Sequence, residues 1–306
     1  MTAALLKGAP PAAQLRLDID AARQRLVGLH QPEPRLATLL VGRHPSAEAY
    51  RNSIERTMKR VTIDHLAVDL PEDISPERFA RQLDELSRDP ELTGVLVLMP
   101  LPEHLPISLV FSHLSPLKDV DGITPVNAGR LHMGLPSLRP STPQGGIELL
   151  DYYGFSIRGK RAVVIGRSNV VGGPMASLLT QRHATVTVCH RQTVDLASET
   201  RRADILAVAA GSAGLVTADM VKPGATVIDF GVNVIDGKIV GDVDFAAVSE
   251  IAAAITPAPG GTGPVTAMVL ARNTITAGFA AMYGSLEDVD LVFPKAPVPI
   301  AAAIDA

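Results

Sequence analysis

The chain has 306 residues, 46% of them hydrophobic and 20% charged, which is typical of a globular protein rather than a disordered one. Its formal net charge is −4 and it has no long basic run, which argues against nucleic acid or a membrane surface as the main partner. The single cysteine, Cys189, excludes an intrachain disulfide, and the N-terminus lacks the apolar core of a signal peptide, so we expect a cytoplasmic protein.

Helical and extended patterns alternate along the first hundred residues. The expected elements are a helix over 12–26, a strand over Arg35–Gly42, a helix from Pro45 to about Arg60, a strand over His65–Asp69, a helix over Pro76–Arg88 and a strand over Thr93–Pro100. This alternation predicts a parallel sheet. Ligand sites in such sheets lie beyond the carboxyl ends of the strands, here at Gly42–Tyr50 and Leu98–Pro102.

Residues 115–146 are rich in proline and glycine and separate two α/β patterns. Asp119 and Asp121 have the spacing that begins a calcium loop, but the remaining ligands and the terminal glutamate are missing. The segment is therefore interpreted as a domain junction, which is a usual place for a substrate cleft, and a linking helix is expected from Glu148. A solvated turn is the alternative for the two aspartates.

A glycine-rich turn follows the apolar strand Ala162–Ile165 and precedes a helical segment from Pro174 to Arg182. Strand, glycine turn and helix together direct backbone N–H groups and a positive helix end toward a phosphate. The spacing departs from the usual dinucleotide fingerprint, because Ser168 stands where its second glycine would be and Gly166 and Gly172 are six residues apart. A plain strand-to-helix turn is the alternative.

Arginines favour NADP over NAD at this turn. The next strand, Thr185–Cys189, ends at His190-Arg191, where an NAD-binding unit has an acidic residue for the ribose. Arg167 lies on the glycine turn, and two guanidinium groups suit a 2′-phosphate. The alternative is that Arg167 and Arg191 are ordinary solvated charges.

The second half continues the α/β pattern. Strands are expected at Ile205–Ala209 and Thr226–Asp229, then a glycine-rich loop over Pro257–Pro264 and a helix over Thr266–Met282. The sequence has no internal repeat, zinc-ligand spacing, P-loop or nucleophile elbow, so no metal site is expected.

Several ordered motifs together resemble the bifunctional methylenetetrahydrofolate dehydrogenase/cyclohydrolase (FolD) family, over residues 36–279. The motifs are Lys118-Asp-Val-Asp-Gly122, Pro125-Val-Asn127, Thr142-Pro-Gln-Gly145, Val164-Ile-Gly-Arg-Ser-Asn169 with Val171-Gly172, Lys222-Pro-Gly224, Gly241-Asp-Val-Asp-Phe245 and Pro259-Gly-Gly-Thr-Gly-Pro264.

The resemblance implies two α/β domains with a cleft between them. A parallel-sheet folate-binding domain would comprise residues 1–142 and 265–290, a Rossmann-type NADP-binding domain residues 143–264, and a loosely held tail residues 291–306. A homodimer is also expected, with tetrahydrofolate one-carbon derivatives as substrates.

The resemblance also implies roles for particular residues. Tyr50 matches the tyrosine that lies along the folate and Asp121 the aspartate that hydrogen-bonds the pterin, so both are candidate catalytic and substrate-binding residues. The substrate would further contact a closing loop at Pro259, Gly260 and Gly261. The positions assigned to the cofactor are Thr142, Gly166, Arg167, Ser168, Val171, Gly172 and Arg191.

Two positions depart from the family pattern. The family has a lysine where this chain has Ile54, and a glutamine where it has Leu98. In the family these side chains hydrogen-bond each other and handle water and protons in the cyclohydrolase step. Losing one partner would leave a buried polar group unsatisfied, whereas losing both is nearly neutral for stability. The paired change therefore indicates a remodelled site.

Three hypotheses follow. The first is an NADP-dependent 5,10-methylenetetrahydrofolate dehydrogenase with weak or absent cyclohydrolase activity, because hydride transfer needs mainly positioning whereas hydrolysis needs a titratable group. The second keeps both activities through a relocated base, such as Arg43 or His44. The third is a non-catalytic paralogue that binds folate or NADP. A remoter alternative is a different two-domain oxidoreductase with a less polar substrate.

Overall fold

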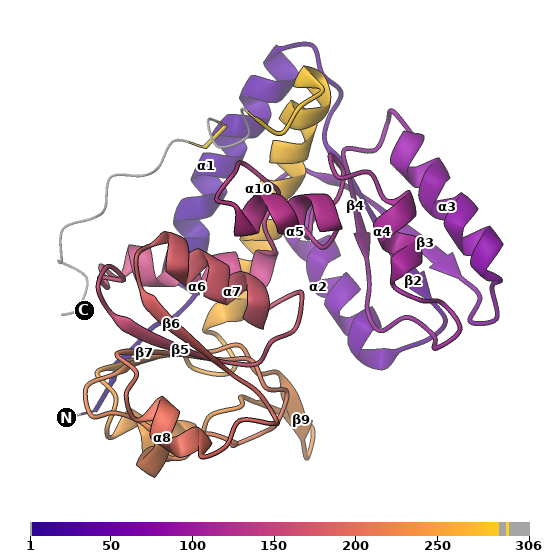
Figure 1. Cartoon of the computed structure of the whole chain (residues 1–306). Helices are drawn as coiled ribbons and strands as arrows, with labels where there is room; N and C mark the ends of the chain where they lie inside the picture. The colour runs from indigo at the N-terminus through magenta and orange to yellow at the C-terminus, as the bar shows by residue number, and fades with distance from the viewer. Residues whose placement is uncertain (1, 288–291, 294–306) are drawn as a thin grey trace. The chain divides into compact units, whose positions relative to one another are not determined.

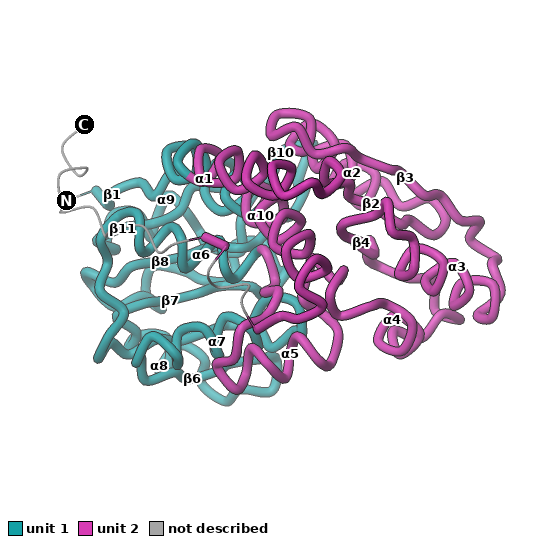
Figure 2. Tube along the Cα trace, turned by 90° about the horizontal axis from the view of Figure 1, so that it is seen from above, with its two compact units in different colours: residues 1–14, 142–266, 296–306 teal, residues 15–141, 267–295 magenta. Residues whose placement is uncertain are grey.

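The computed structural model describes residues 2–287, 292 and 293. Among these, residues 2–14 and 142–266 form one compact unit, and residues 15–141 and 267–287 with 292 and 293 form a second (Figure 2). We call them the nucleotide unit and the second unit. Both are α/β folds built on parallel strands, which confirms the predicted fold class.

The nucleotide unit is built on a six-stranded sheet in the order β1-β11-β8-β7-β5-β6, and every neighbouring pair is parallel. Its strands are β1 (Ala4–Leu5), β5 (Arg161–Ile165), β6 (Thr185–Cys189), β7 (Ile205–Val208), β8 (Thr226–Asp229) and β11 (Ala254–Ile255). Its other elements are α7 (Gly172–Gln181), α8 (Leu196–Thr200), a 3-10 turn (Ala218–Met220), the antiparallel strands β9 (Asn233–Ile235) and β10 (Lys238–Val240), and α9 (Phe245–Ser249).

Branched and apolar side chains make this sheet its unit's core. The central strands β5, β7 and β8 are buried almost throughout, as their unbroken runs of Val, Ile and Leu predict for a parallel sheet covered on both faces. Cys189 is fully buried at the end of β6, and burial raises the pKa of its thiol. It is therefore a packing residue.

The second unit contains the three-stranded parallel sheet β3-β2-β4 (Figure 1). Its elements are β2 (Arg35–Val41), α2 (Pro45–Arg60), β3 (Asp64–Leu70), α3 (Pro76–Arg88), β4 (Gly94–Val97), α4 (Ser108–His113) and α5 (Pro125–His132). Three helices contribute to both units, namely α1 (Ala9–Gly28), α6 (Ser141–Tyr152) and α10 (Thr262–Tyr283).

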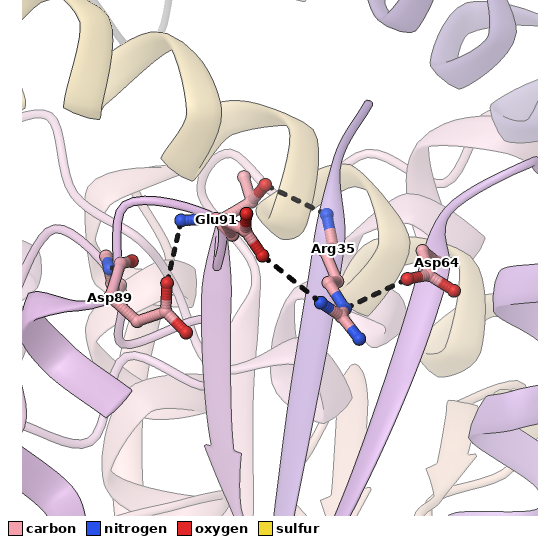
Figure 3. A network of polar contacts seen from close by, with 6 residues as sticks. Arg35, Asp64, Asp89 and Glu91 are labelled. Carbon is pink, nitrogen blue, oxygen red and sulfur yellow. Dashed lines mark hydrogen bonds and ion pairs between the residues drawn. The ribbon is translucent and has the colours of Figure 1, made fainter. Parts of the chain in front are cut away.

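Charged side chains gather at the amino ends of β2 and β3 and before β4 (Figure 3). Arg35 Nε lies 2.9 Å from Asp64 Oδ2, and Arg35 Nη1 lies 3.7 Å from Glu91 Oε2. The backbone N–H of Glu91 donates to Asp89 Oδ1 at 2.9 Å. Because both acidic partners of Arg35 are largely exposed, these ion pairs add little to stability. They occupy the end of the sheet opposite to the one where ligand sites form.

The structure differs from the predicted boundaries at three places. Residues 2–14 belong to the nucleotide unit, because β1 pairs with β11 and the N–H of Gly8 donates to the Gly260 carbonyl at 2.8 Å. The helix predicted from Glu148 begins at Ser141. Val292, assigned to a loosely held tail, is buried, and its carbonyl accepts from Arg25 at 3.3 Å; the tail residues 291 and 294–306 lie outside the described residues.

The early start of α6 has a packing reason. A Cβ on Gly146 would lie 2.5 Å from Cζ of Phe230, and one on Gly145 would lie 3.3 Å from the Thr266 nitrogen. These glycines are therefore helical residues at close contacts, although in the sequence they indicate a loop.

Within the described residues, α10 is the one helix long and apolar enough to cross a membrane. However, 78% of its most apolar 18-residue stretch is buried inside the protein, as is typical of a helix in a protein core.

Candidate active site

Two candidate substrate residues, Tyr50 and Asp121, lie in the second unit. Tyr50 is in the second turn of α2, the helix that follows the carboxyl end of β2, and 39% of its surface is exposed. Asp121 lies after β4, on a segment held by a bridge between Val95 and Asp119 and by Asn273 Nδ2, which donates to the Val120 carbonyl at 2.8 Å. Tyr50 therefore follows the carboxyl end of a parallel strand, as the sequence predicts, and Asp121 lies two residues beyond the bridge that joins its segment to β4.

Ser141 joins these two side chains. Its hydroxyl donates to Asp121 Oδ1 at 3.1 Å, and hydrogen bonding by Ser141 lowers the pKa of both Asp121 and Tyr50. Burial and the nearby Asp119 carboxylate raise the pKa of Asp121 to about 7. Burial of the hydroxyl and the charge of Asp121 raise the pKa of Tyr50, which keeps the phenol protonated at neutral pH.

The Lys-Asp-Val-Asp-Gly motif divides into structural and candidate functional residues. Lys118 Nζ donates to the Leu86 carbonyl at 3.4 Å and to the Asp89 carbonyl, both at the C-terminal end of α3. Asp119 is fully buried and accepts from the Ile123 N–H, the Thr124 N–H and hydroxyl, and the Asn127 amide. Lys118 and Asp119 thus fix the loop, while Asp121 is left at the polar cluster with Tyr50 and Ser141.

A pH-dependent stability difference should separate Asp121 from Asp119. The pKa of Asp121 is raised from 3.8 to about 7, so its contribution to stability is full below pH 3.8 and is lost as pH rises to about 7. Asp121→Asn removes this loss, at about 1.4 kcal/mol for each pKa unit. We expect the melting temperature of the variant, relative to the unaltered protein, to be higher at pH 8 than at pH 5. A difference that does not change between these pH values would contradict the assignment.

Asp119→Asn is the matched control. An amide at this position leaves buried N–H donors without their carboxylate, at a cost of about 1–3 kcal/mol for each unsatisfied group. We expect lower melting temperatures at both pH values.

The two positions that depart from the family pattern are deeply buried in the same unit. Ile54 on α2 is 1% exposed and Leu98 after β4 is 2% exposed. The backbone N–H of Leu98 continues the sheet by donating to the Leu39 carbonyl at 2.9 Å. Both side chains are core residues here, and neither carries a proton-handling group. Arg43 and His44, the candidates for a relocated base, are exposed before α2, and His44 Nδ1 lies 2.9 Å from the Ser46 hydroxyl.

In the nucleotide unit, the turn between β5 and α7 holds most of the predicted cofactor residues. Gly166 has φ 115°, and a Cβ there would lie 2.2 Å from the Ala209 carbonyl oxygen. A Cβ on Gly172 would lie 2.1 Å from the Gly166 carbonyl oxygen. Ser168 Oγ accepts from the N–H groups of Val171 at 3.1 Å and Gly172 at 3.4 Å. This tight turn at a helix N-terminus fits a dinucleotide phosphate, which needs close approach to the backbone.

Arg167 and Arg191 lie at corresponding positions beyond two paired strands. Ile165 of β5 pairs with Cys189 of β6, and the Gly166 N–H donates to the Cys189 carbonyl at 2.8 Å. Arg167 comes two residues after Ile165, Arg191 comes two residues after Cys189, and both arginines are exposed. This register is what a shared 2′-phosphate site at one end of the turn requires.

The remaining predicted site residues belong to the nucleotide unit. Thr142 is the second residue of α6, and Pro259, Gly260 and Gly261 precede α10, with Gly260 at φ 101° and held by Gly8. Tyr50 and Asp121 belong to the other unit, so the contact of this loop with a folate stays a prediction.

Sequence reasoning missed two groups at these sites. Ser141 carried no signal, because it stands between prolines in a stretch that indicates a loop. Asp242 is fully buried and accepts from the N–H groups of Ala210, Gly211 and Ser212 at 2.7–2.9 Å. It thereby shapes the loop after β7, beside β5 at the sheet's carboxyl edge. The motif Gly241-Asp-Val-Asp-Phe245 contained that signal, without indicating its role.

Over the described part of the chain, no group of three or more His, Cys, Asp or Glu side chains could hold a metal ion.

Two models of one protein family match successive parts of the chain. The family model described as tetrahydrofolate dehydrogenase/cyclohydrolase, catalytic domain, matches residues 6–121. The model for the NAD(P)-binding domain of the same family matches residues 140–281. The second match confirms the predicted nicotinamide dinucleotide cofactor.

Individual relatives match over nearly their whole length. The bifunctional protein FolD of Chloroflexus aurantiacus is 51% identical over 278 residues, which are 90% of this chain and 98% of the relative. The crystal structure of the Campylobacter jejuni FolD enzyme has a TM-score of 0.87 and 40% identity, covering 90% of this chain and 99% of that one. The Trypanosoma brucei enzyme, complexed with NADP and an inhibitor, has a TM-score of 0.87 and 33% identity, covering 92% and 99%.

Proposed function

Because the chain belongs to the tetrahydrofolate dehydrogenase/cyclohydrolase family, we propose that it oxidises 5,10-methylenetetrahydrofolate to 5,10-methenyltetrahydrofolate with NADP, and that its cyclohydrolase activity is weak or absent. The observation that carries the proposal is the contrast between two sets of residues in one unit. Tyr50 and Asp121 are present and linked through Ser141, whereas Ile54 and Leu98 fill the two divergent positions with buried hydrocarbon.

The dehydrogenase step needs positioning more than proton transfer. NADP accepts the hydride, and the folate nitrogens next to the reacting carbon carry the positive charge that results. The protein has to bind the pterin, which Asp121 does through its carboxyl and Tyr50 through its exposed ring, and to exclude misaligned poses. No step in this reaction requires the missing lysine.

The hydrolytic step makes a demand that these residues do not meet. Water must be activated and a proton moved near the methenyl carbon, which is the work of a positioned titratable side chain. Ile54 and Leu98 have none, and the hydroxyl of Tyr50 stays protonated at neutral pH because its pKa is raised.

Purified protein mixed with methylenetetrahydrofolate and NADP tests the dehydrogenase, with formation of reduced nicotinamide as the readout. We expect turnover with NADP, and less with NAD. No turnover while both ligands bind would instead support a non-catalytic paralogue.

Arg191→Ser should change the cofactor preference. The variant loses a charge-assisted hydrogen bond to the 2′-phosphate, so we expect NADP binding to weaken by about 1–3 kcal/mol more than NAD binding. The measurement is Kd for each cofactor by calorimetry. The matched control is Arg158→Ser, an exposed arginine that precedes the amino end of β5 and should leave both constants unchanged. Equal weakening of NADP and NAD by Arg191→Ser would contradict the assignment.

We further propose that the protein is a homodimer, as the family resemblance implies. Light scattering should give the mass of two chains, and the mass of one chain would contradict it.

A further inference from the structure

A buried serine hydroxyl connects the two predicted folate contacts. Ser141 is 1% exposed at the first position of α6, whereas Tyr50 is on α2 and Asp121 is on the loop after β4. All three belong to the second unit. The Ser141 hydroxyl donates to Asp121 Oδ1 at 3.1 Å, and the same hydroxyl lowers the pKa of the Tyr50 phenol.

The number of protons fixes the direction of the bond between Ser141 and Asp121 when Asp121 is ionised. A serine hydroxyl has one proton and two lone pairs, and an ionised carboxylate can only accept. The Ser141 hydroxyl therefore donates to Asp121, and the carboxylate is the acceptor. The second oxygen of Asp121 can then accept from pterin N–H groups.

We propose that Ser141 is a positioning residue for the folate, whose hydroxyl orients the Asp121 carboxylate beside the Tyr50 phenol as an acceptor for the ligand. This inference rests on the proposed function and adds a residue to its substrate site. The group acts through Asp121 and Tyr50 and has no direct part in the chemistry.

Charge on the surrounding groups makes this arrangement pH-dependent. The groups acting on Asp121 are the Asp119 carboxylate, which opposes its ionisation, and the hydroxyl and backbone N–H of Ser141, which favour it. The group acting on the Tyr50 phenol, besides Ser141, is Asp121. Removing the Ser141 hydroxyl should therefore make Asp121 harder to ionise and shift pterin binding to higher pH.

The test compares Ser141→Ala with Ser137→Ala. The control removes another buried serine hydroxyl from the same unit, one that has no hydrogen-bond partner. The measurements are Kd for tetrahydrofolate by calorimetry, KM and kcat with methylenetetrahydrofolate, and kcat/KM between about pH 6 and pH 9. Ser141→Thr retains the hydroxyl and tests for rescue.

For Ser141→Ala we expect Kd and KM to rise about 10-fold, as the loss of one buried hydrogen bond predicts, with kcat changed less than about threefold. The acidic limb of the kcat/KM profile should move to higher pH. Ser137→Ala should match the unaltered protein, and Ser141→Thr should restore the profile.

Equal Kd values and superimposable pH profiles for Ser141→Ala and Ser137→Ala would overturn this inference alone, given normal binding by the unaltered protein. A lower melting temperature for Ser141→Ala with unchanged Kd would overturn it too, since it would make the serine purely structural. An unaltered protein that neither binds nor turns over folate would overturn the proposed function and this inference with it.

Discussion

Asp121→Asn should give a protein that is more stable at pH 8 and much less active. Asp121 is a carboxyl whose burial next to Asp119 raises its pKa to about 7, so its ionisation costs folding free energy. An amide avoids this cost but offers one acceptor oxygen where a carboxylate offers two. We expect kcat/KM for methylenetetrahydrofolate to fall about 10- to 100-fold, the equivalent of a lost hydrogen bond to a charged group.

Opposite effects on stability and activity are what identify a ligand-binding residue. Replacing a carboxyl that only fixed a loop would lower both the stability and the activity of the protein, as we expect for Asp119→Asn. The measurements are steady-state kinetics at pH 8 and thermal melting of the same preparations. Full activity of Asp121→Asn with the folate substrate would contradict its assignment to the pterin.

Restoring both family side chains should create cyclohydrolase activity. Ile54→Lys with Leu98→Gln places an amine and an amide at two positions that are now 1% and 2% exposed. The family resemblance implies that the pair hydrogen-bond each other, and the lysine supplies the titratable group that hydrolysis needs. We expect methenyltetrahydrofolate hydrolysis to be at least about tenfold faster than with the unaltered protein. General acid–base catalysis typically contributes about 100-fold or more, so a tenfold gain corresponds to a partly restored catalytic group.

Ile54→Lys alone should do less. A lysine at this buried position without a glutamine partner is desolvated, which lowers its pKa and destabilises the fold. The apolar control is Ile54→Met with Leu98→Met, which changes shape without adding a polar group and should leave hydrolysis unchanged. A gain in the methionine pair equal to that of the lysine–glutamine pair would show that altered packing is responsible.

The sequence predicted the elements whose residues repeat with a clear period. α3 was predicted at Pro76–Arg88 with its observed bounds, because Ser75 caps it, proline starts it and an apolar face recurs along it. The buried strands β5 and β8 followed in the same way from runs of branched residues. The strand expected over Thr93–Pro100 is shorter, at Gly94–Val97.

Local signals failed where tertiary contacts override them. The start of α6 was hidden because Pro143, Gly145 and Gly146 indicate a loop, although the two glycines are there for close packing. For the same reason α5 was missed in the loop-rich segment. Its N-cap residue is Thr124, whose hydroxyl is fixed by donating to the buried Asp119 carboxylate.

The site was predictable in its residue types and not in its connections. Tyr50, Asp121 and the glycine turn carried motif signals, but a hydroxyl at Ser141 becomes significant only when the fold brings α2, α6 and the loop after β4 together within the second unit. Likewise, the equivalence of Arg167 and Arg191 depends on the register of β5 with β6, which no single segment encodes.

The decay of methenyltetrahydrofolate absorbance, with the unaltered protein against a buffer blank, tests the central claim most directly. It is measured on a preparation that reduces NADP with methylenetetrahydrofolate, so that the protein is known to be folded and able to bind folate. Because Ile54 and Leu98 supply no proton-handling group, we predict a decay rate close to that of the blank. Rapid enzyme-dependent decay would contradict the account and would require a base elsewhere in the site.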